Sequence, residues 1–395
     1  SKILWTALLL RAGFSLINYY IFPLPDSQKD AVSFEALATS LSSQYGKDIF
    51  FNMSFGDSHL ISWVIGTLYT YTGHSPLMAQ NLSVMLGTIS VYFVYQLAFS
   101  IWGHIPAIKS AWLTAFFPTL ILYSALTLRE AYIVFFLLLA LLGASYWAKT
   151  SKIKYLILSG FGFFVATLFH GAMIIGAISL YAIFLLKTAK QLWLQISCGR
   201  FQPFKLGFLI LVCMPIITYI AGYYSLPKLG GIDQLLDAER LLRKASGMGS
   251  NRLASTNFDP ITTGAYLGPR FIAESFQELI LKAPIKYIYF LFSPFPWNVS
   301  KLSHLFGLLD GLLYMLLVYF FWENRKSVWS NPSSKMILMI LASYVLVFGI
   351  TTINFGTAIR HRSKFAVMLI VLAIPKIFPS IAKFQKHVKK HTMSD

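Results

Sequence analysis

Charged residues are scarce in this sequence, and their scarcity excludes an ordinary soluble domain. Asp, Glu, Lys and Arg make up 12% of the 395 residues, which is about half of what soluble domains carry. Hydrophobic residues reach 56% and aromatic residues 16%. Apolar runs of roughly 18 residues or more recur along the chain, whereas a β-barrel would show short alternating segments. The sequence therefore predicts an all-α polytopic membrane protein.

Cysteine and the motifs of soluble cofactor chemistry are also nearly absent. Cys198 and Cys213 provide neither a disulfide framework nor a metal motif. The sequence has no Walker loop, dinucleotide-binding fingerprint or HExxH motif. We therefore predict no cofactor, although a divalent metal stays open. The net charge of +18 is better explained by basic cytoplasmic loops and affinity for anionic lipid or phosphate than by a nucleic-acid partner.

The apolar runs predict about ten transmembrane helices in one integral membrane domain, 1–395. Two further apolar segments, 60–73 and 284–297, are short, and we expect interfacial or re-entrant helices there. Arg11 is the only strong charge expected near the middle of a span. The expected spans are 3–22, 77–101, 107–124, 129–148, 155–169, 171–187, 206–224, 303–322, 336–354 and 364–382.

Basic loops predict the orientation of these spans. Together with Lys2, Lys109 and the C-terminal residues, they hold 17 of the 33 Lys and Arg residues but only two of the 15 acidic ones. Because cytoplasmic loops are enriched in Lys and Arg, both termini are predicted to be cytoplasmic. The basic segments are 149–154, 187–205, 323–335 and 376–390.

Two long polar segments then lie on the outer side. The first, 23–59, is expected to contain an amphipathic surface helix from Asp30 to Tyr45. The second, 225–283, is mixed in charge, and we interpret it as a lid because such long loops in compact domains are usually functional. The apolar stripe of the expected surface helix consists of Val32, Ala36, Leu37 and Leu41.

Acidic residues of the first outer segment are candidates for catalysis. Asp30 begins the expected surface helix, where a carboxylate is either a helix cap or a general base at the membrane boundary. Asp57 and His59 directly precede an apolar helix and are either caps or polar groups over the same cavity. Asp26 and Glu35 are nearby rivals of Asp30.

Ionisable residues beside the outer ends of two spans are candidates for binding. Arg129 and Glu130 lie between strongly apolar runs, where such residues usually face a bundle interior or an aqueous cavity. Snorkelling to the interface is the alternative for Arg129. His170, at an expected hairpin before Gly171, is a further candidate.

The densest outer basic cluster comprises Arg360, His361, Arg362 and Lys364. Its positive charge runs against the predicted orientation bias. Guanidinium groups form bidentate bonds to phosphate, so we expect a lipid-phosphate or pyrophosphate site here, with headgroup anchoring as the alternative. Trp297 follows a proline-rich turn that we interpret as scaffold with a sugar-stacking role.

Several of these segments resemble the GT-C superfamily of membrane glycosyltransferases. The segment 30–38 resembles its first-loop motif, in which an acidic residue is followed by an aromatic residue and small residues. The stretch 59–98 resembles the short helix, turn and long membrane helix that follow, and the resemblance covers 3–150. Later segments resemble proteins of bacterial polysaccharide gene clusters, including Wzy-like repeat-unit polymerases. Asp30 departs from many relatives because Ala31, and not a second acid, follows it.

This resemblance implies a GT-C-like fold in the bacterial inner membrane. It also implies transfer of a sugar or oligosaccharide from a polyprenyl phosphate or pyrophosphate donor to a glycan or lipid-linked acceptor on the periplasmic face. Repeat-unit polymerisation and single-sugar transfer stay open. A transporter or flippase for lipid-linked sugars is the competing class, which favours duplicated halves and mid-span charges.

The resemblance and the residue patterns together give three sets of candidate residues. The expected catalytic residues are Asp30 and Asp57. The expected phosphate-binding or donor-binding residues are Arg360, Arg362, His361 and Arg129. The expected acceptor-binding or sugar-binding residues are His59, Glu130, His170 and Trp297.

The predicted topology can be tested by labelling one introduced cysteine. Asp30→Cys in a chain without Cys198 and Cys213 should react with a membrane-impermeant maleimide from outside intact cells. Reaction of position 30 only after permeabilisation would place it in the cytoplasm, which would contradict the topology and the periplasmic mechanism together.

Overall fold

The computed structural model describes residues 2–28, 30–55, 59–197, 275–299, 302–352 and 354–377. Every regular element within these ranges is a helix. Five of these helices are long and apolar enough to cross a membrane, or six if one bent pair forms a single span. These findings confirm the prediction of a helical membrane protein with several spans.

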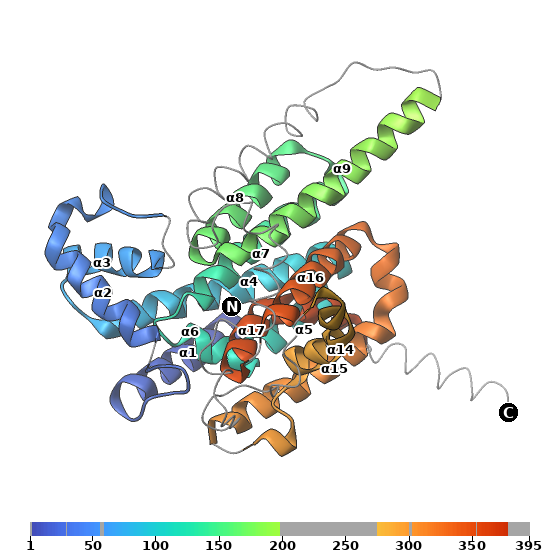
Figure 1. Cartoon of the computed structure of the whole chain (residues 1–395). Helices are drawn as coiled ribbons and strands as arrows, with labels where there is room; N and C mark the ends of the chain where they lie inside the picture. Colours follow the sequence, from blue (N-terminus) through green and yellow to red (C-terminus); the bar gives the residue numbers. More distant parts are fainter. Residues whose placement is uncertain are drawn as a thin grey trace.

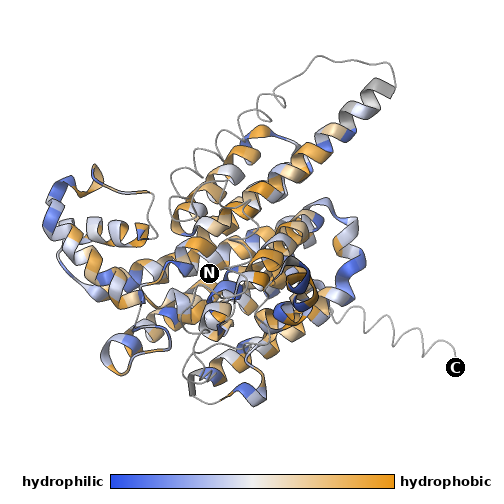
Figure 2. Ribbon diagram, viewed as in Figure 1, coloured by the Kyte–Doolittle hydropathy of each residue, from blue (hydrophilic) through white to orange (hydrophobic). Residues whose placement is uncertain are grey.

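Most of the helices form one central bundle, with α2 (Asp30–Tyr45) and α3 (Leu60–Thr72) to one side and α8 (Ile153–Phe169) and α9 (Ile174–Ser197) extending from it in another direction (Figure 1). Hydrophobic residues cover most of the bundle helices, and hydrophilic residues gather at helix ends and connections (Figure 2). The chain order is α1 (Lys2–Tyr20), α2 (Asp30–Tyr45), η1 (Gly46–Phe50), α3 (Leu60–Thr72), α4 (Pro76–Trp102), α5 (His104–Phe116), α6 (Pro118–Ser124), α7 (Glu130–Thr150), α8 (Ile153–Phe169), η2 (Gly171–Met173), α9 (Ile174–Ser197), α14 (Phe276–Phe292), η4 (Pro296–Asn298), α15 (Leu302–Ser330), α16 (Pro332–Thr351) and α17 (Phe355–Ile377).

Each expected span within the described ranges falls on one or more helices. The expected spans 206–224 and the end of 364–382 lie outside the described residues, as does 225–274 of the expected lid. The span expected at 107–124 is broken at Phe117 into α5 and α6, which meet at a bend of 59°. Pro118 explains the break, because proline has no backbone N–H and disfavours the helical conformation of the residue before it.

The surface helix expected at 30–45 is present as α2, and of its expected apolar stripe only Leu41 lies on the face that α2 buries against the protein. α2 buries Ala31, Phe34, Ala38 and Leu41, whereas Val32 is 51% exposed. The reason is that α2 packs against α3, so protein contacts select its buried face.

The starts of two C-terminal helices also differ from expectation. α14 begins at Phe276, within the segment expected to be loop, and α17 begins at Phe355, ahead of the expected 364. In α17 the basic residues lie inside the helix, because partners from distant segments neutralise them. Arg11 is likewise not the only charge deep in a span, since Asp310 lies fully buried in α15.

Helix α17 is the central element of the bundle. Its residues from Arg362 to Ile374 are all buried. It contacts α15, α5, α16, α7, α14, α4 and α6. A helix that is covered on all sides belongs to the core of its protein, so the positions of many other helices depend on α17.

Two glycines allow α7 and α8 to lie unusually close together. A Cβ atom at Gly143 would lie 2.6 Å from the backbone nitrogen of Ser159, and one at Gly162 would lie 2.6 Å from that of Ala140. Small residues that permit close backbone approach are a common basis of helix association in membranes. This pair therefore fixes α8 against α7.

A buried ion pair joins α17 to α15. The Nε atom of Arg362 lies 2.7 Å from Oδ2 of Asp310, and both side chains are 0% exposed. Arg362 also donates hydrogen bonds to the carbonyl oxygens of Leu291 and Gly307, at 3.2 and 3.1 Å. Thr119 of α6 donates to the other carboxylate oxygen of Asp310. One guanidinium group thus connects α14, α15 and α17.

Loss of the Asp310 carboxylate should destabilise the fold strongly. Asp310→Ala leaves the charge of Arg362 buried without its counter-ion, which typically costs about 3–5 kcal/mol. Thermal unfolding in detergent measures the effect. The matched control is Glu278→Ala, which breaks the partly exposed pair with Lys282 and should cost less than about 1 kcal/mol. Equal losses of stability in the two variants would contradict a structural role for the buried pair.

Candidate functional site

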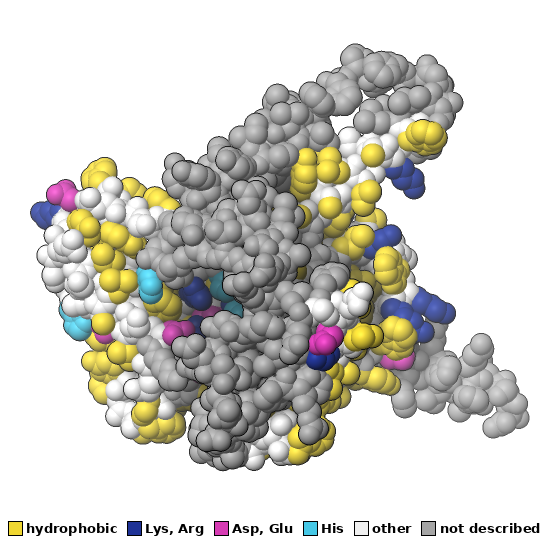
Figure 3. Space-filling view, in the orientation of Figure 1, with side chains coloured by type: hydrophobic (Ala, Val, Ile, Leu, Met, Phe, Trp, Pro, Cys, Tyr) yellow, Lys and Arg dark blue, Asp and Glu magenta, His cyan; other side chains and the backbone are white. Residues whose placement is uncertain are grey.

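Charged side chains meet where the N-terminal ends of α2, α7 and α17 come together. Asp30 is the first residue of α2, Glu130 is the first residue of α7, and Arg360 lies near the start of α17. The positive end of a helix dipole favours carboxylates at both N-termini. Basic, acidic and histidine side chains lie together in a hollow on one face of the molecule (Figure 3).

Arg360 bridges two carboxylates from different helices. Its Nη1 atom lies 2.5 Å from Oδ2 of Asp30, and its Nη2 and Nε atoms lie 3.2 and 3.3 Å from Oε1 of Glu130. Exposure falls from 49% for the Asp30 side chain to 17% for Arg360 and 3% for Glu130. The solvent-facing end of this arrangement is therefore Asp30, and its fixed end is Glu130.

Lys364 lies behind Glu130 and is fully buried. Its Nζ atom is 3.7 Å from Oε1 of Glu130 and 3.1 Å from Nδ1 of His361. The His361 ring meets the His170 ring edge-on, with centroids 5.3 Å apart. Burial, followed by the positive charges of Lys364 and Arg129, lowers the pKa of His170 well below its ordinary value. The His170 ring is therefore neutral and adds polarity without further charge.

A third carboxylate belongs to the same site. The hydroxyl of Tyr123 donates a 2.9 Å hydrogen bond to Oδ2 of Asp26, and the charges of Arg360 and Glu130 both act on Asp26. Asp26 adopts a left-handed backbone conformation with φ of 63°, which Asp tolerates better than most residues. We define the Arg360 cluster as Asp26, Asp30, Arg129, Glu130, His170, Arg360, His361 and Lys364.

The cluster includes most of the expected site residues but not Arg362. Residues two apart on a helix point roughly 200° away from each other, so Arg360 faces the cluster and Arg362 faces α14 and α15. The guanidinium of Arg362 is occupied by Asp310 and backbone carbonyls. The expected Arg360/Arg362 pair over one phosphate is therefore not formed in this structure.

The remaining expected residues lie around or away from this cluster. His59 precedes α3 and packs edge-on against Phe34, one helical turn after Asp30. Trp297 is 74% exposed and stacks on Phe295 with centroids 4.8 Å apart. Asp57 lies outside the described residues. Arg129 donates a long hydrogen bond, 3.5 Å, to the carbonyl of Phe169.

Glu35, the other rival of Asp30, has a different set of partners. Its Oε1 atom lies 2.6 Å from Nε2 of His74 and accepts a hydrogen bond from Tyr69. These contacts tie α2 to the end of α3 and the loop before α4. Of the acids around Asp30, Asp26 thus shares the Arg360 cluster and Glu35 does not.

Sequence reasoning did not assign Tyr123 or Asp310 to any role. Tyr123 lies near the end of an apolar run, where nothing local distinguishes it from a core aromatic. Asp310 was the more visible signal, because an acid within the run FGLLDGLLYML is expensive to bury without a partner. Within the described residues, no group of three or more His, Cys, Asp or Glu side chains is placed to hold a metal ion.

Comparison with known proteins adds no identity to this geometry. The chain matches no protein-family model, and no curated protein matches it. The GT-C resemblance therefore stays a prediction drawn from motifs, and the chemistry of the Arg360 cluster is the structural basis for a function.

Glu130 should stabilise the cluster by neutralising two cations. Glu130→Gln leaves Arg360 and the fully buried Lys364 short of negative charge, and we expect a loss on the order of 3 kcal/mol. Removal of one of those cations should relieve the excess, so Glu130→Gln combined with Lys364→Met should be more stable than Glu130→Gln alone. Thermal unfolding of the wild type, Glu130→Gln, Lys364→Met and the double variant completes the cycle. Strictly additive losses of stability would contradict the coupling between Glu130 and Lys364.

Proposed function

We propose that this protein is a membrane glycosyltransferase that takes a sugar or oligosaccharide from a polyprenyl phosphate or pyrophosphate donor. The proposal places the reaction on the periplasmic face of the bacterial inner membrane, in the assembly of a cell-surface polysaccharide. It includes about ten spans, a GT-C-like fold and cytoplasmic termini. The observation that carries it is the half-exposed carboxylate of Asp30 held against Arg360.

The pairing of Asp30 with Arg360 suggests how donor binding would prepare catalysis. Phosphate and carboxylate both form charge-assisted bonds with guanidinium, so a donor phosphate can replace Asp30 on Arg360. Glu130 holds the other edge of Arg360 and keeps it in place during this exchange. The displaced Asp30 carboxylate is then available to accept a proton.

Sugar transfer follows from these positions. Asp30 accepts the proton of an acceptor hydroxyl while that oxygen attacks the anomeric carbon. The bond between the anomeric carbon and the phosphate oxygen breaks, and its electron pair stays on the phosphate. Arg360 stabilises this growing negative charge, with Lys364 and Arg129 behind it in a poorly hydrated region.

The other site residues would orient the sugars. The neutral rings of His170 and His361 offer hydrogen-bonding groups without attracting the phosphate. His59, beside α2, would contact the acceptor, and the exposed face of Trp297 is suited to stacking on a sugar ring. The role proposed for Asp57 follows from its sequence position alone.

A transporter of lipid-linked sugars is the second candidate. The observation that favours it is the broken span α5–α6 beside the buried Arg11, because transporters use discontinuous helices near their substrate sites. Incubation of purified protein in vesicles with lipid-linked repeat units separates the candidates. A product ladder indicates a polymerase, one added unit indicates a single-sugar transferase, and translocation without a product supports transport.

Two substitutions should divide binding from chemistry in this assay. Asp30→Asn should abolish product formation while donor affinity is retained or increased, because Asp30 competes with phosphate for Arg360. Arg360→Ala should weaken donor binding by about tenfold to a hundredfold, the usual effect of losing charge-assisted hydrogen bonds.

The matched control is Arg325→Ala, since Arg325 bonds within its own helix to Trp322 and lies on the predicted cytoplasmic side. Normal turnover by Asp30→Asn at normal protein levels would rule out Asp30 as the base. Donor affinity that is unchanged in Arg360→Ala would rule out the phosphate role of Arg360.

A further inference from the structure

Arg11 is a buried cation in the middle of α1 that the proposed reaction does not use. It is 1% exposed, and among the described residues it forms no ion pair with an acidic side chain. Its guanidinium instead donates to backbone carbonyls, namely those of Ala7, Thr114 and Ala115 at 3.1, 3.3 and 3.4 Å. Two of these carbonyls belong to the last turn of α5.

The helix break leaves those two carbonyls without their usual backbone donors. In an α-helix the carbonyl of residue 114 would accept from the N–H of residue 118, but Pro118 has no N–H. The bend likewise removes the usual partner of the Ala115 carbonyl. Arg11 supplies both bonds and places a positive charge at the negative end of the α5 dipole. It therefore caps α5 and stabilises the bend.

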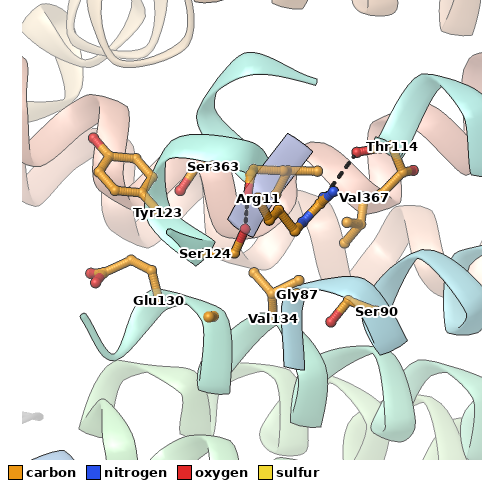
Figure 4. Close-up of a pocket in the computed structure, with 12 residues that line it drawn as sticks. Arg11, Gly87, Ser90, Thr114, Tyr123, Ser124, Glu130, Val134, Ser363 and Val367 are labelled. Atoms are coloured by element: carbon orange, nitrogen blue, oxygen red, sulfur yellow. Dashed lines mark hydrogen bonds between the residues drawn. The ribbon is translucent and has the colours of Figure 1, made fainter. Parts of the chain in front are cut away.

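A narrow cavity, lined mainly by apolar surface with several hydroxyl groups and two charged side chains, extends from Arg11 toward the Arg360 cluster. Arg11 lies in its middle, with Glu130 and Tyr123 toward one end and Thr114 and Ser90 toward the other (Figure 4). Gly87 leaves the space that Arg11 occupies, because a Cβ atom there would lie 3.1 Å from Nε of Arg11 and 2.4 Å from Cβ of Ser124.

Two oppositely charged residues that line this cavity each have one buried side-chain atom without a hydrogen-bond partner in the described part of the chain. These atoms are Nε of Arg11 and Oε2 of Glu130. Glu130 disfavours an anion here and Arg11 disfavours a cation, whereas the hydroxyl groups between them suit water. A buried water needs two to four such polar partners. Ordered water is therefore the chemical class of ligand that fits the cavity.

We infer that Arg11 is a positioning residue for the Arg360 cluster. By capping α5 it fixes the direction of α6, which carries Tyr123, the partner of Asp26, and leads within a few residues to Glu130. Through cavity water it also stabilises the second carboxylate oxygen of Glu130. The effect on sugar transfer rests on the proposed function, whereas the structural coupling does not.

Hydrogen exchange with mass spectrometry tests the coupling without any substrate. Arg11→Met should speed amide exchange in the segment 114–130 by about tenfold or more, because local opening no longer breaks the capping bonds. Arg11→Lys should restore much of the protection. Arg325→Met is the matched control and should leave 114–130 unchanged. Exchange in 114–130 that equals the wild type, or a rise spread evenly over α15 to α17, would overturn the inference.

A second variant covers the case in which Arg11→Met does not fold. Gly87→Ala keeps the charge but forces Ser124 and Arg11 to move, and it should raise exchange in the same segment.

In the transfer assay, Arg11→Met should lower kcat at least tenfold and leave KM for the donor within about twofold. An unchanged kcat would overturn the positioning role. A wild-type protein that transfers no sugar would reject the proposed function and leave the exchange result standing.

Discussion

The helix α17 carries three cations through an apolar bundle, and most of the described architecture follows from how they are neutralised. An unpaired charge in such surroundings costs several kcal/mol, so each cation requires a partner from another helix. Arg362 takes Asp310 of α15, whereas Arg360 and Lys364 share Glu130 of α7. These pairs fix α7 and α15 on different sides of α17. The start of α17 at Phe355 is capped locally, because the Asn354 side chain accepts hydrogen bonds from the N–H groups of Gly356 and Thr357.

The same ion pairs differ in solvent exposure from one end of the Arg360 cluster to the other, and this difference is useful for chemistry. Lys364 is fully buried, Arg360 is largely buried, and Asp30 is half-exposed. Exchange of one anion for another is cheapest at the exposed end, where water can solvate the displaced carboxylate. The buried end supplies positive charge that solvent screens little. In the proposed mechanism, such a site presents a cation only to a ligand that can compete with a carboxylate.

Sequence periodicity and hydropathy were sufficient to place helices over the part of the chain that the structure describes. They located α2 to within its ends, predicted a helix over each described span and identified Asp30, Glu130 and Arg360 as unusual. They failed wherever a distant segment supplied the deciding contact. The buried face of α2 depends on α3, and the basic residues inside α17 are paired with carboxylates far away in the sequence. The expectation that Arg360 and Arg362 face the same phosphate was wrong for a local reason. Residues two positions apart on a helix point in nearly opposite directions.

Three buried or largely buried arginines differ in a way that separates structure from function. Arg11 donates hydrogen bonds to carbonyls at the end of α5. One of them, that of Thr114, has no helical donor because Pro118 has no N–H. Arg362 donates hydrogen bonds to carbonyls at the end of α14. There the Phe290 carbonyl likewise lacks a helical donor, because the residue four positions later is Pro294. Backbone carbonyls cannot move away without disrupting the fold, so the roles of Arg11 and Arg362 are structural. Arg360 instead binds two carboxylate side chains from other helices. Of these, Glu130 is buried and Asp30 is half-exposed to solvent. Only that kind of partner can be replaced by a phosphate, and this physical distinction is the reason that we propose Arg360, and not Arg11 or Arg362, as the phosphate-binding residue.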